Sequence, residues 1–133
     1  MTRYAFLPAF LLLAVACMDS TSSNGGCTAS ATLTCVTIQD FTFSPASVTI
    51  KAGTAVMWTN NGPSSHTTTS DSGVWNSGAL SAPGGGGGYG GPTAGGSYEF
   101  TFSTPGTYGY HCTIHPPTVS QYAAFRGTIT VTK

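Results

Sequence analysis

The most informative part of the chain is a short stretch that contains two histidines and a cysteine, Tyr108-Gly109-Tyr110-His111-Cys112-Thr113-Ile114-His115-Pro116-Pro117. Side chains alternate between the two faces of a β-strand, so Tyr108, Tyr110 and Cys112 share one face and His111 lies on the other. If the two tyrosines pack into the core, Cys112 points inward at the end of the strand. His115, in the loop that follows, can then turn back toward the sulfur. The stretch therefore predicts a thiolate and an imidazole that face the same point.

A second histidine follows another predicted strand. The segment Ala55–Thr59 is rich in residues that favour strands, and His66 lies in the loop after it. Loops at one end of a β-sandwich can meet, so His66 can reach the other two side chains. One thiolate and two imidazoles in a roughly trigonal arrangement are the ligands that mononuclear electron-transfer copper uses. We therefore identify His66, Cys112 and His115 as candidate ligands of one copper ion.

Short segments with β-branched and aromatic residues, separated by turn residues, make up the chain around this stretch. In Tyr98–Ser103, three aromatic side chains share one face, as expected for a half-buried antiparallel strand. Turn signals occur at Lys51-Ala52-Gly53-Thr54 and at Pro105-Gly106, and no helix of normal length is evident. The pattern predicts an all-β sandwich with strands at Cys35–Gln39, Ser47–Ile50, Ala55–Thr59, Tyr98–Ser103, Thr107–Cys112 and Gly127–Thr132.

From Val36 to the C-terminus the order of these features resembles a plastocyanin-type cupredoxin. The resemblance rests on Trp58-Thr59-Asn60-Asn61, His66, Trp75-Asn76-Ser77-Gly78, Tyr110-His111-Cys112-Thr113-Ile114-His115-Pro116 and Gly127-Thr128-Ile129-Thr130-Val131. It implies an antiparallel Greek-key β-sandwich that binds one copper ion through His66, Cys112 and His115, with His111 outside the ligand set. It also implies a one-electron carrier with a redox partner protein.

The chain departs from this family at the axial position of the metal. A methionine normally follows the second histidine there as a weak ligand, but the methionines of this chain are Met1, Met18 and Met57, and none is well placed. The alignment puts Phe125 at that position, after an extra segment Thr118–Ala124. We expect a three-coordinate site without an axial side chain, which favours Cu(I) and raises the reduction potential. The alternative is Gln121, whose amide oxygen would favour Cu(II), as in stellacyanin-like proteins.

The N-terminal stretch is typical of an export signal. Residues 1–16 combine Arg3 with an apolar run that is too short to span a bilayer. Small residues directly before Cys17 resemble a bacterial lipoprotein cleavage site, and ordinary signal cleavage nearby is the alternative. We expect a signal peptide at 1–16, a lipidated Cys17 with a flexible tether at 17–34, and a copper-binding domain at 35–133. The protein is then exported to the periplasm or cell surface and attached to a membrane through Cys17.

Export also permits disulfides, and Cys27 and Cys35 are close enough in sequence to form one. Cys112 is then left without a partner, which metal ligation explains, and a reactive or inert buried thiol is the alternative. The glycine-rich segment 84–96 has low complexity and predicts a disordered surface loop.

The chain has four basic and four acidic residues and a formal net charge of zero, so it lacks the basic footprint of a nucleic-acid-binding protein. The sequence contains neither a nucleophile elbow nor a phosphate-binding loop, so these motifs give no indication of an enzyme. We expect a monomer that passes single electrons through the exposed edge of His115, beside Pro116 and Pro117, to a redox partner that the sequence does not identify. Two alternatives stay open: a module for copper storage, delivery or sensing, and a structural sandwich with an inert Cys112.

Overall fold

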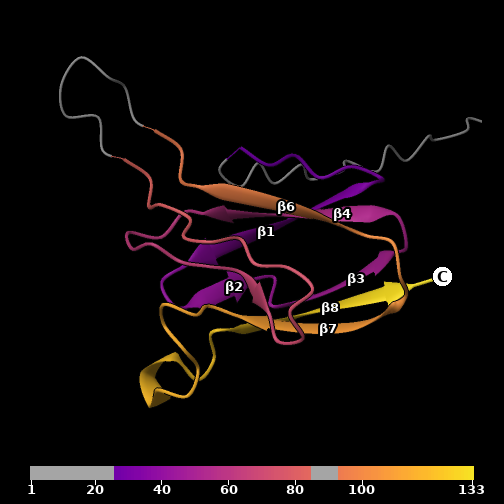
Figure 1. The fold of residues 1–133 in the computed structure, drawn as a ribbon. Helices are drawn as coiled ribbons and strands as arrows, with labels where there is room; N and C mark the ends of the chain where they lie inside the picture. Colours follow the sequence, from indigo (N-terminus) through magenta and orange to yellow (C-terminus); the bar gives the residue numbers. More distant parts are fainter. Residues whose placement is uncertain (1–25, 85–92) are drawn as a thin grey trace, which may run out of the picture.

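The computed structural model describes residues 26–84 and 93–133, whose strands form two sheets packed face to face (Figure 1). The first sheet has the order β2-β1-β4-β6, and its strands are β1 (Leu33–Gln39), β2 (Thr42–Ser44), β4 (Thr54–Asn60) and β6 (Ser97–Phe102). The second has the order β3-β8-β7-β5, and its strands are β3 (Ser47–Lys51), β5 (Thr69–Ser70), β7 (Gly106–His111) and β8 (Arg126–Thr132). The expected signal peptide and Cys17 lie outside the described residues.

Each sheet contains one parallel pair of strands, so the sandwich is mixed where we expected it to be purely antiparallel. β1 runs parallel to β4, with Val36 opposite Trp58, and β3 runs parallel to β8, with Ile50 opposite Val131. The chain visits β3 in the second sheet between β1 and β4, and it re-enters the first sheet in the original direction. Alternating burial shows which face of the sheet a residue occupies, and parallel and antiparallel strands have the same alternation. The sequence pattern therefore did not reveal that these pairs are parallel.

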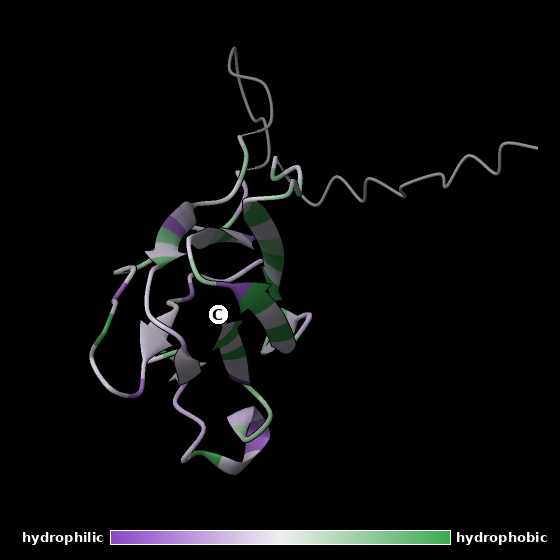
Figure 2. Cartoon of the chain, turned by 90° about the vertical axis from the view of Figure 1, so that its right-hand side faces the viewer, coloured by the Kyte–Doolittle hydropathy of each residue, from purple (hydrophilic) through white to green (hydrophobic). Residues whose placement is uncertain are grey.

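Large aromatic side chains from both sheets fill the space between the layers. Trp58 on β4 is fully buried and stacks on Trp75, with ring centroids 5.5 Å apart. Tyr110 on β7 meets Trp58 edge-on from the opposite sheet. Figure 2 shows hydrophobic bands alternating with paler ones along the strands, as this one-sided burial requires. Burial of each such side chain stabilises the fold by about 1.5–3 kcal/mol, which makes the interior a rigid support for the loops at its ends.

A disulfide between Cys27 and Cys35 attaches the N-terminal segment to β1, so the pairing that the sequence left open is present. Cys27 is buried, and the N–H group of Ala55 on β4 donates a hydrogen bond to the carbonyl of Thr32. Cys112 is the one free cysteine within the described ranges.

The two ends of the glycine-rich segment are part of the folded structure, although we expected a disordered loop over 84–96. Gly84 forms an isolated bridge with Thr93, and the carbonyl of Gly96 accepts a hydrogen bond from the N–H group of Asn60. Gly95 packs so tightly on Asn60 that a Cβ atom would lie 1.7 Å from its carbonyl oxygen. Residues 85–92 lie outside the described part of the chain.

The one helix in the described ranges is a single 3-10 turn, Ser120–Tyr122, just before β8. None of the described helical structure is both long and apolar enough to cross a bilayer.

Candidate metal centre

His66, Cys112 and His115 meet at the end of the sandwich where the segments after β4 and β7 leave the sheets (Figure 1). The sulfur of Cys112 lies 3.9 Å from Nδ1 of His66 and 3.8 Å from Nδ1 of His115. Three ligands bound at about 2.1 Å and spread by about 120° would lie about 3.6 Å from one another. The observed spacing therefore fits one ion in a trigonal site. His66 and Cys112 are fully buried, and His115 is partly exposed.

β7 aims Cys112 into the sandwich. Tyr110 and Cys112 are both fully buried, so the inward face of the strand continues past its last residue. His111 lies on the outer face, where its Nδ1 is 2.5 Å from a carboxylate oxygen of Asp71. The sequence predicted that His111 lies on the opposite face from Tyr110 and Cys112, and the structure shows the same arrangement.

The loop that carries His66 is held by the buried side chain of Asn60. Its amide nitrogen donates hydrogen bonds to the carbonyls of Ser64 and Leu80, at 2.8 Å and 2.9 Å, and its oxygen accepts one from the N–H group of Gly62. His66 and Leu80 also exchange backbone hydrogen bonds in both directions. The position of His66 is therefore set by backbone contacts that do not depend on a metal.

Residues next to the candidate ligands tie the two loops together. The N–H group of Thr67 donates to the sulfur of Cys112 at 3.3 Å. The hydroxyl oxygen of Thr67 accepts a hydrogen bond from the N–H group of Thr113 at 2.9 Å. These two hydrogen bonds hold the sulfur of Cys112 in place beside the loop that carries His66.

The far nitrogen of His66 contacts a carboxylate. Nε2 lies 2.7 Å from Oδ1 of Asp40, which occupies the turn between β1 and β2, and the hydroxyl of Ser64 donates to Oδ2 at 3.1 Å. Burial lowers the pKa of His66 below 6.5, and Asp40 opposes that shift. Burial pushes the pKa of Asp40 upward, but hydrogen bonds from His66 and Ser64 hold it below 3.8. At neutral pH, a neutral His66 donates a hydrogen bond from its Nε2–H group to an ionised Asp40. The lone pair on Nδ1 is then free to bind a metal.

Aromatic carbon surrounds the imidazoles. Phe125 is fully buried, and its ring centroid lies 5.0 Å from that of His66. The rings of Phe41 and Tyr122 lie 5.1 Å and 5.0 Å from that of His115. Gln121 is exposed on the 3-10 turn. Of the two residues considered for the axial position, the one packed beside the imidazoles is therefore Phe125.

We did not predict from the sequence that Asp40, Phe41 and Tyr122 belong to this site. The first two follow the first predicted strand as His66 follows the third, but this relation is informative only once the two strands are known to be parallel. Since β1 and β4 are parallel, both strands end at the same edge of the sheet. Without that pairing, the 26 residues between Asp40 and His66 give no indication of contact.

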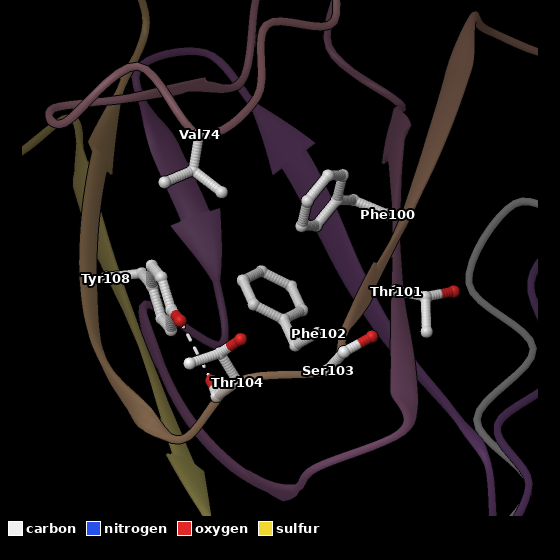
Figure 3. Close-up of a pocket in the computed structure, with 7 residues that line it drawn as sticks. All are labelled: Val74, Phe100, Thr101, Phe102, Ser103, Thr104 and Tyr108. Carbon is white, nitrogen blue, oxygen red and sulfur yellow. Dashed lines mark hydrogen bonds between the residues drawn. The ribbon is translucent and has the colours of Figure 1, made fainter.

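A separate small pocket of about 170 Å³ lies beside the turn that joins β6 to β7 (Figure 3). The hydroxyl of Tyr108 donates to the carbonyl of Thr104 at its edge, at 2.8 Å. The pocket shares no residue with the His–Cys–His cluster, and it is lined by Val74, Phe100, Thr101, Phe102, Ser103, Thr104 and Tyr108.

A two-sheet sandwich with a buried cysteine between two histidines at one end defines a metalloprotein of the cupredoxin class. A sequence model described as copper binding proteins, plastocyanin/azurin family, matches residues 30–132. The plastocyanin of Scenedesmus fuscus is 43% identical over 99 residues, covering 67% of this chain and 85% of the relative. The chain therefore belongs to the plastocyanin/azurin family of copper binding proteins, and copper is its cofactor.

Solved structures confirm the cupredoxin β-sandwich. Oxidised plastocyanin from Dryopteris crassirhizoma is 27% identical with a TM-score of 0.51, covering 74% of this chain and 100% of that one. A purple cupredoxin from Nitrosopumilus maritimus has a TM-score of 0.52 at 24% identity, covering 74% of this chain and 98% of that one, and it supports the fold alone.

Proposed function

We propose that this protein is a one-electron carrier that works outside the cytoplasm, with one copper ion held by His66, Cys112 and His115. The proposal is carried by the position of the Cys112 sulfur between two imidazole Nδ1 atoms, at 3.9 Å and 3.8 Å, in a member of a copper-binding family. When bound, copper supplies a Cu(II)/Cu(I) couple that takes up and releases one electron. The protein contributes the ligands and their surroundings. We propose a carrier of electrons and not an enzyme.

A rigid ligand frame supports this function. Electron transfer is favoured when the ligands keep their positions in both oxidation states, and a fully satisfied hydrogen-bond network restricts such movement. Asn60 holds the loop of His66, and Thr67 links that loop to Cys112 and Thr113. The ligands therefore reorganise little when the electron arrives or leaves.

We propose that the electron passes through His115, because it is partly exposed whereas His66 and Cys112 are buried. Two large apolar side chains near it are exposed, Ile114 at 46% and Val119 at 43%. The chain carries no net charge, so long-range electrostatic steering of a partner is weak. The redox partner is then a protein that docks on this end through apolar contact, and the carrier acts as a monomer.

We propose that the copper has no axial side-chain ligand. Support comes from the burial of Phe125 against His66 and from the exposure of Gln121. A phenyl ring has no lone pair to offer. A three-coordinate site in an apolar surround stabilises Cu(I) and raises the reduction potential.

For the N-terminal part we propose a signal peptide at 1–16 and a lipid anchor on Cys17, with a tether that reaches from Cys17 to the folded copper-binding domain. The expected tether at 17–34 is too long at its end, because the disulfide of Cys27 and the start of β1 at Leu33 already belong to the fold. The lipoprotein-like residues before Cys17 support the anchor. A Cys17→Ser variant should move from the membrane fraction to the soluble exported fraction. Unchanged membrane attachment of that variant would contradict the anchor.

The function is tested by loading the protein with Cu(II) and recording visible absorption and electron paramagnetic resonance. We expect one copper per chain and an intense thiolate-to-copper band that disappears in Cys112→Ser. Stopped-flow mixing with a small redox reagent then measures electron exchange. Tight copper binding with slow exchange would favour copper storage or delivery, and failure to bind copper at the three residues would reject the proposal.

A further inference from the structure

We propose that Asp40 is a positioning residue of the copper centre, whose carboxylate orients His66 and strengthens its Nδ1 as a donor, so that Cu(II) is stabilised relative to Cu(I). The inference rests on the proposed function, in which His66 binds copper through Nδ1. It concerns a residue outside the predicted ligand set, brought to His66 from the turn between β1 and β2.

Both carboxylate oxygens of Asp40 have a partner. Oδ1 accepts from Nε2 of His66 at 2.7 Å, and Oδ2 accepts from the hydroxyl of Ser64 at 3.1 Å. Gly62 closes the remaining side, because a Cβ atom there would lie 2.8 Å from Oδ1 and 3.0 Å from the backbone nitrogen of Asp40. The carboxylate is therefore held in one orientation, and it fixes the rotation of the His66 ring.

The contact also determines which His66 nitrogen is available to a metal. A carboxylate accepts and cannot donate, so the proton of the neutral imidazole resides on Nε2 and the lone pair on Nδ1. Nδ1 is the atom that faces the sulfur of Cys112. Hydrogen bonds of this kind raise the basicity of a metal-binding histidine. A more basic imidazole favours the ion of higher charge, which is Cu(II).

Within residues 26–84 and 93–133, no lysine or arginine forms a salt bridge with Asp40. Among the described residues, the salt bridges of carboxylates are made with histidines alone, His66 with Asp40 and His111 with Asp71. The Asp40 side chain is 27% exposed and the His66 side chain 0%. The negative charge therefore lies at the edge of a buried site, where solvent screens it less than at an open surface. Its effect on the potential opposes that of the aromatic surround.

The pair formed by Asp71 and His111 provides a matched control. This pair has the same chemistry, with 2.5 Å between a carboxylate oxygen of Asp71 and a ring nitrogen of His111. His111 directly precedes Cys112 in the chain. His111 faces outward, however, and is not in the cluster of possible ligands. Asp71→Asn therefore removes one negative charge near the site without removing a partner of a ligand.

The experiment compares wild type, Asp40→Asn, Asp40→Ala and Asp71→Asn as full-length, copper-loaded proteins. Cu(II) and Cu(I) affinities are measured by competition with chelators, and the reduction potential by voltammetry. We expect Asp40→Asn to weaken Cu(II) binding about 10- to 100-fold, as is typical when the partner of a ligand is lost. Cu(I) binding should weaken less. A tenfold change in their ratio raises the potential by about 59 mV for a one-electron couple. Asp71→Asn should change the ratio less than about threefold, since its charge is more exposed and more screened.

A second measurement does not depend on the redox couple. In the Cu(I) protein, the Nε2 proton of His66 should exchange slowly with water and give a separate proton NMR signal, which Asp40→Ala removes and Asp71→Asn keeps. This measurement tests the contact itself, even where Asp40→Ala binds copper weakly.

Three results would overturn the inference. One is a potential of Asp40→Asn equal to or below that of wild type, and another is an equal rise in Asp40→Asn and Asp71→Asn. The third is a His66 Nε2 signal that persists in Asp40→Ala. Each leaves the proposed function intact as long as wild type shows the thiolate-to-copper band. Absence of that band in wild type would reject the proposed function, and the inference with it.

Discussion

The phenyl ring of Phe125 meets the imidazole of His66 edge-on, with ring centroids 5.0 Å apart and planes at 85°. Phe125 has no exposed surface, and its ring also lies 6.4 Å from that of His115. Carbon atoms of Phe125 therefore lie beside both imidazoles, which supports our proposal that the copper has no axial side-chain ligand. This relationship makes the axial position the most direct place to alter the redox properties.

Replacing Phe125 by methionine should lower the reduction potential. The thioether supplies a weak axial donor that stabilises Cu(II), and we expect a shift of about tenfold in the Cu(II)/Cu(I) affinity ratio, or about 59 mV. Voltammetry measures the shift, and Gln121→Ala is the control, because Gln121 is exposed. A potential that moves only in Gln121→Ala would show that the amide, and not the phenyl position, controls the axial side.

Gly127→Ala should destabilise the fold strongly. Gly127 lies opposite Tyr110 in the β7–β8 pair, and a Cβ atom on it would lie 2.1 Å from Cζ of the Tyr110 ring. Displacing a buried ring in this way costs about 1–3 kcal/mol, which thermal unfolding of the copper-free protein measures. Thr128→Ala, on the next residue of the strand, should cost less. Equal losses in the two variants would indicate that the contact with the ring is not the cause.

The stability contributed by Tyr110 should depend on pH in the alkaline range. Burial raises the pKa of Tyr110 from 10.0 to about 12, and Trp58 opposes this shift only in part. Between these pH values the unfolded chain loses the proton and the folded chain keeps it, so the free energy of unfolding falls as pH rises, by roughly 3 kcal/mol at most. Tyr110→Phe lacks this loss. Denaturant unfolding of the copper-free proteins should show the variant gaining on wild type above pH 10, and parallel curves would contradict the prediction.

Removing the disulfide should reduce stability without changing the copper spectrum. The bridge spans a sequence separation of 8, for which loop-closure entropy predicts a loss of about 2–3 kcal/mol in the Cys27→Ser, Cys35→Ser double variant. Neither cysteine belongs to the metal cluster. Thermal unfolding measures the loss, and visible absorption reports the site. A weakened thiolate-to-copper band in folded protein would reveal a coupling that this view excludes.

Alternation in the sequence was sufficient to predict the longer strands and the inward direction of Cys112. It failed for β2 and β5, with 3 and 2 residues, because a period of two cannot be recognised in so short a segment. The 3-10 turn was missed because Ser120–Tyr122 buries no side chain and therefore has no apolar pattern. The alternation also could not predict the direction of the strands, as the two parallel pairs show.

The three candidate ligands could be identified from residue types and from family resemblance, because their chemistry is rare. Asp40 could not, since a carboxylate in a turn has no distinguishing feature until its neighbour in space is known. Phe41 was hidden for another reason: it has a positive φ of 65°, which sequence rules expect of glycine or asparagine and not of a bulky ring. Contacts between turns of different strands arise from the packing of the sheets, which residue patterns describe only indirectly.

His66 lies in the segment that leaves β4 of one sheet, and Cys112 directly follows β7 of the other, 46 residues later. The two side chains come within reach of each other only after both layers have docked. A metal ion bound by both side chains would link the two sheets at this end of the sandwich. Its bonds must then break before the sheets can separate. With copper bound as proposed, the thiolate-to-copper band would count the copper-loaded molecules whose sheets have docked, and its loss in denaturant would report when the two sheets separate.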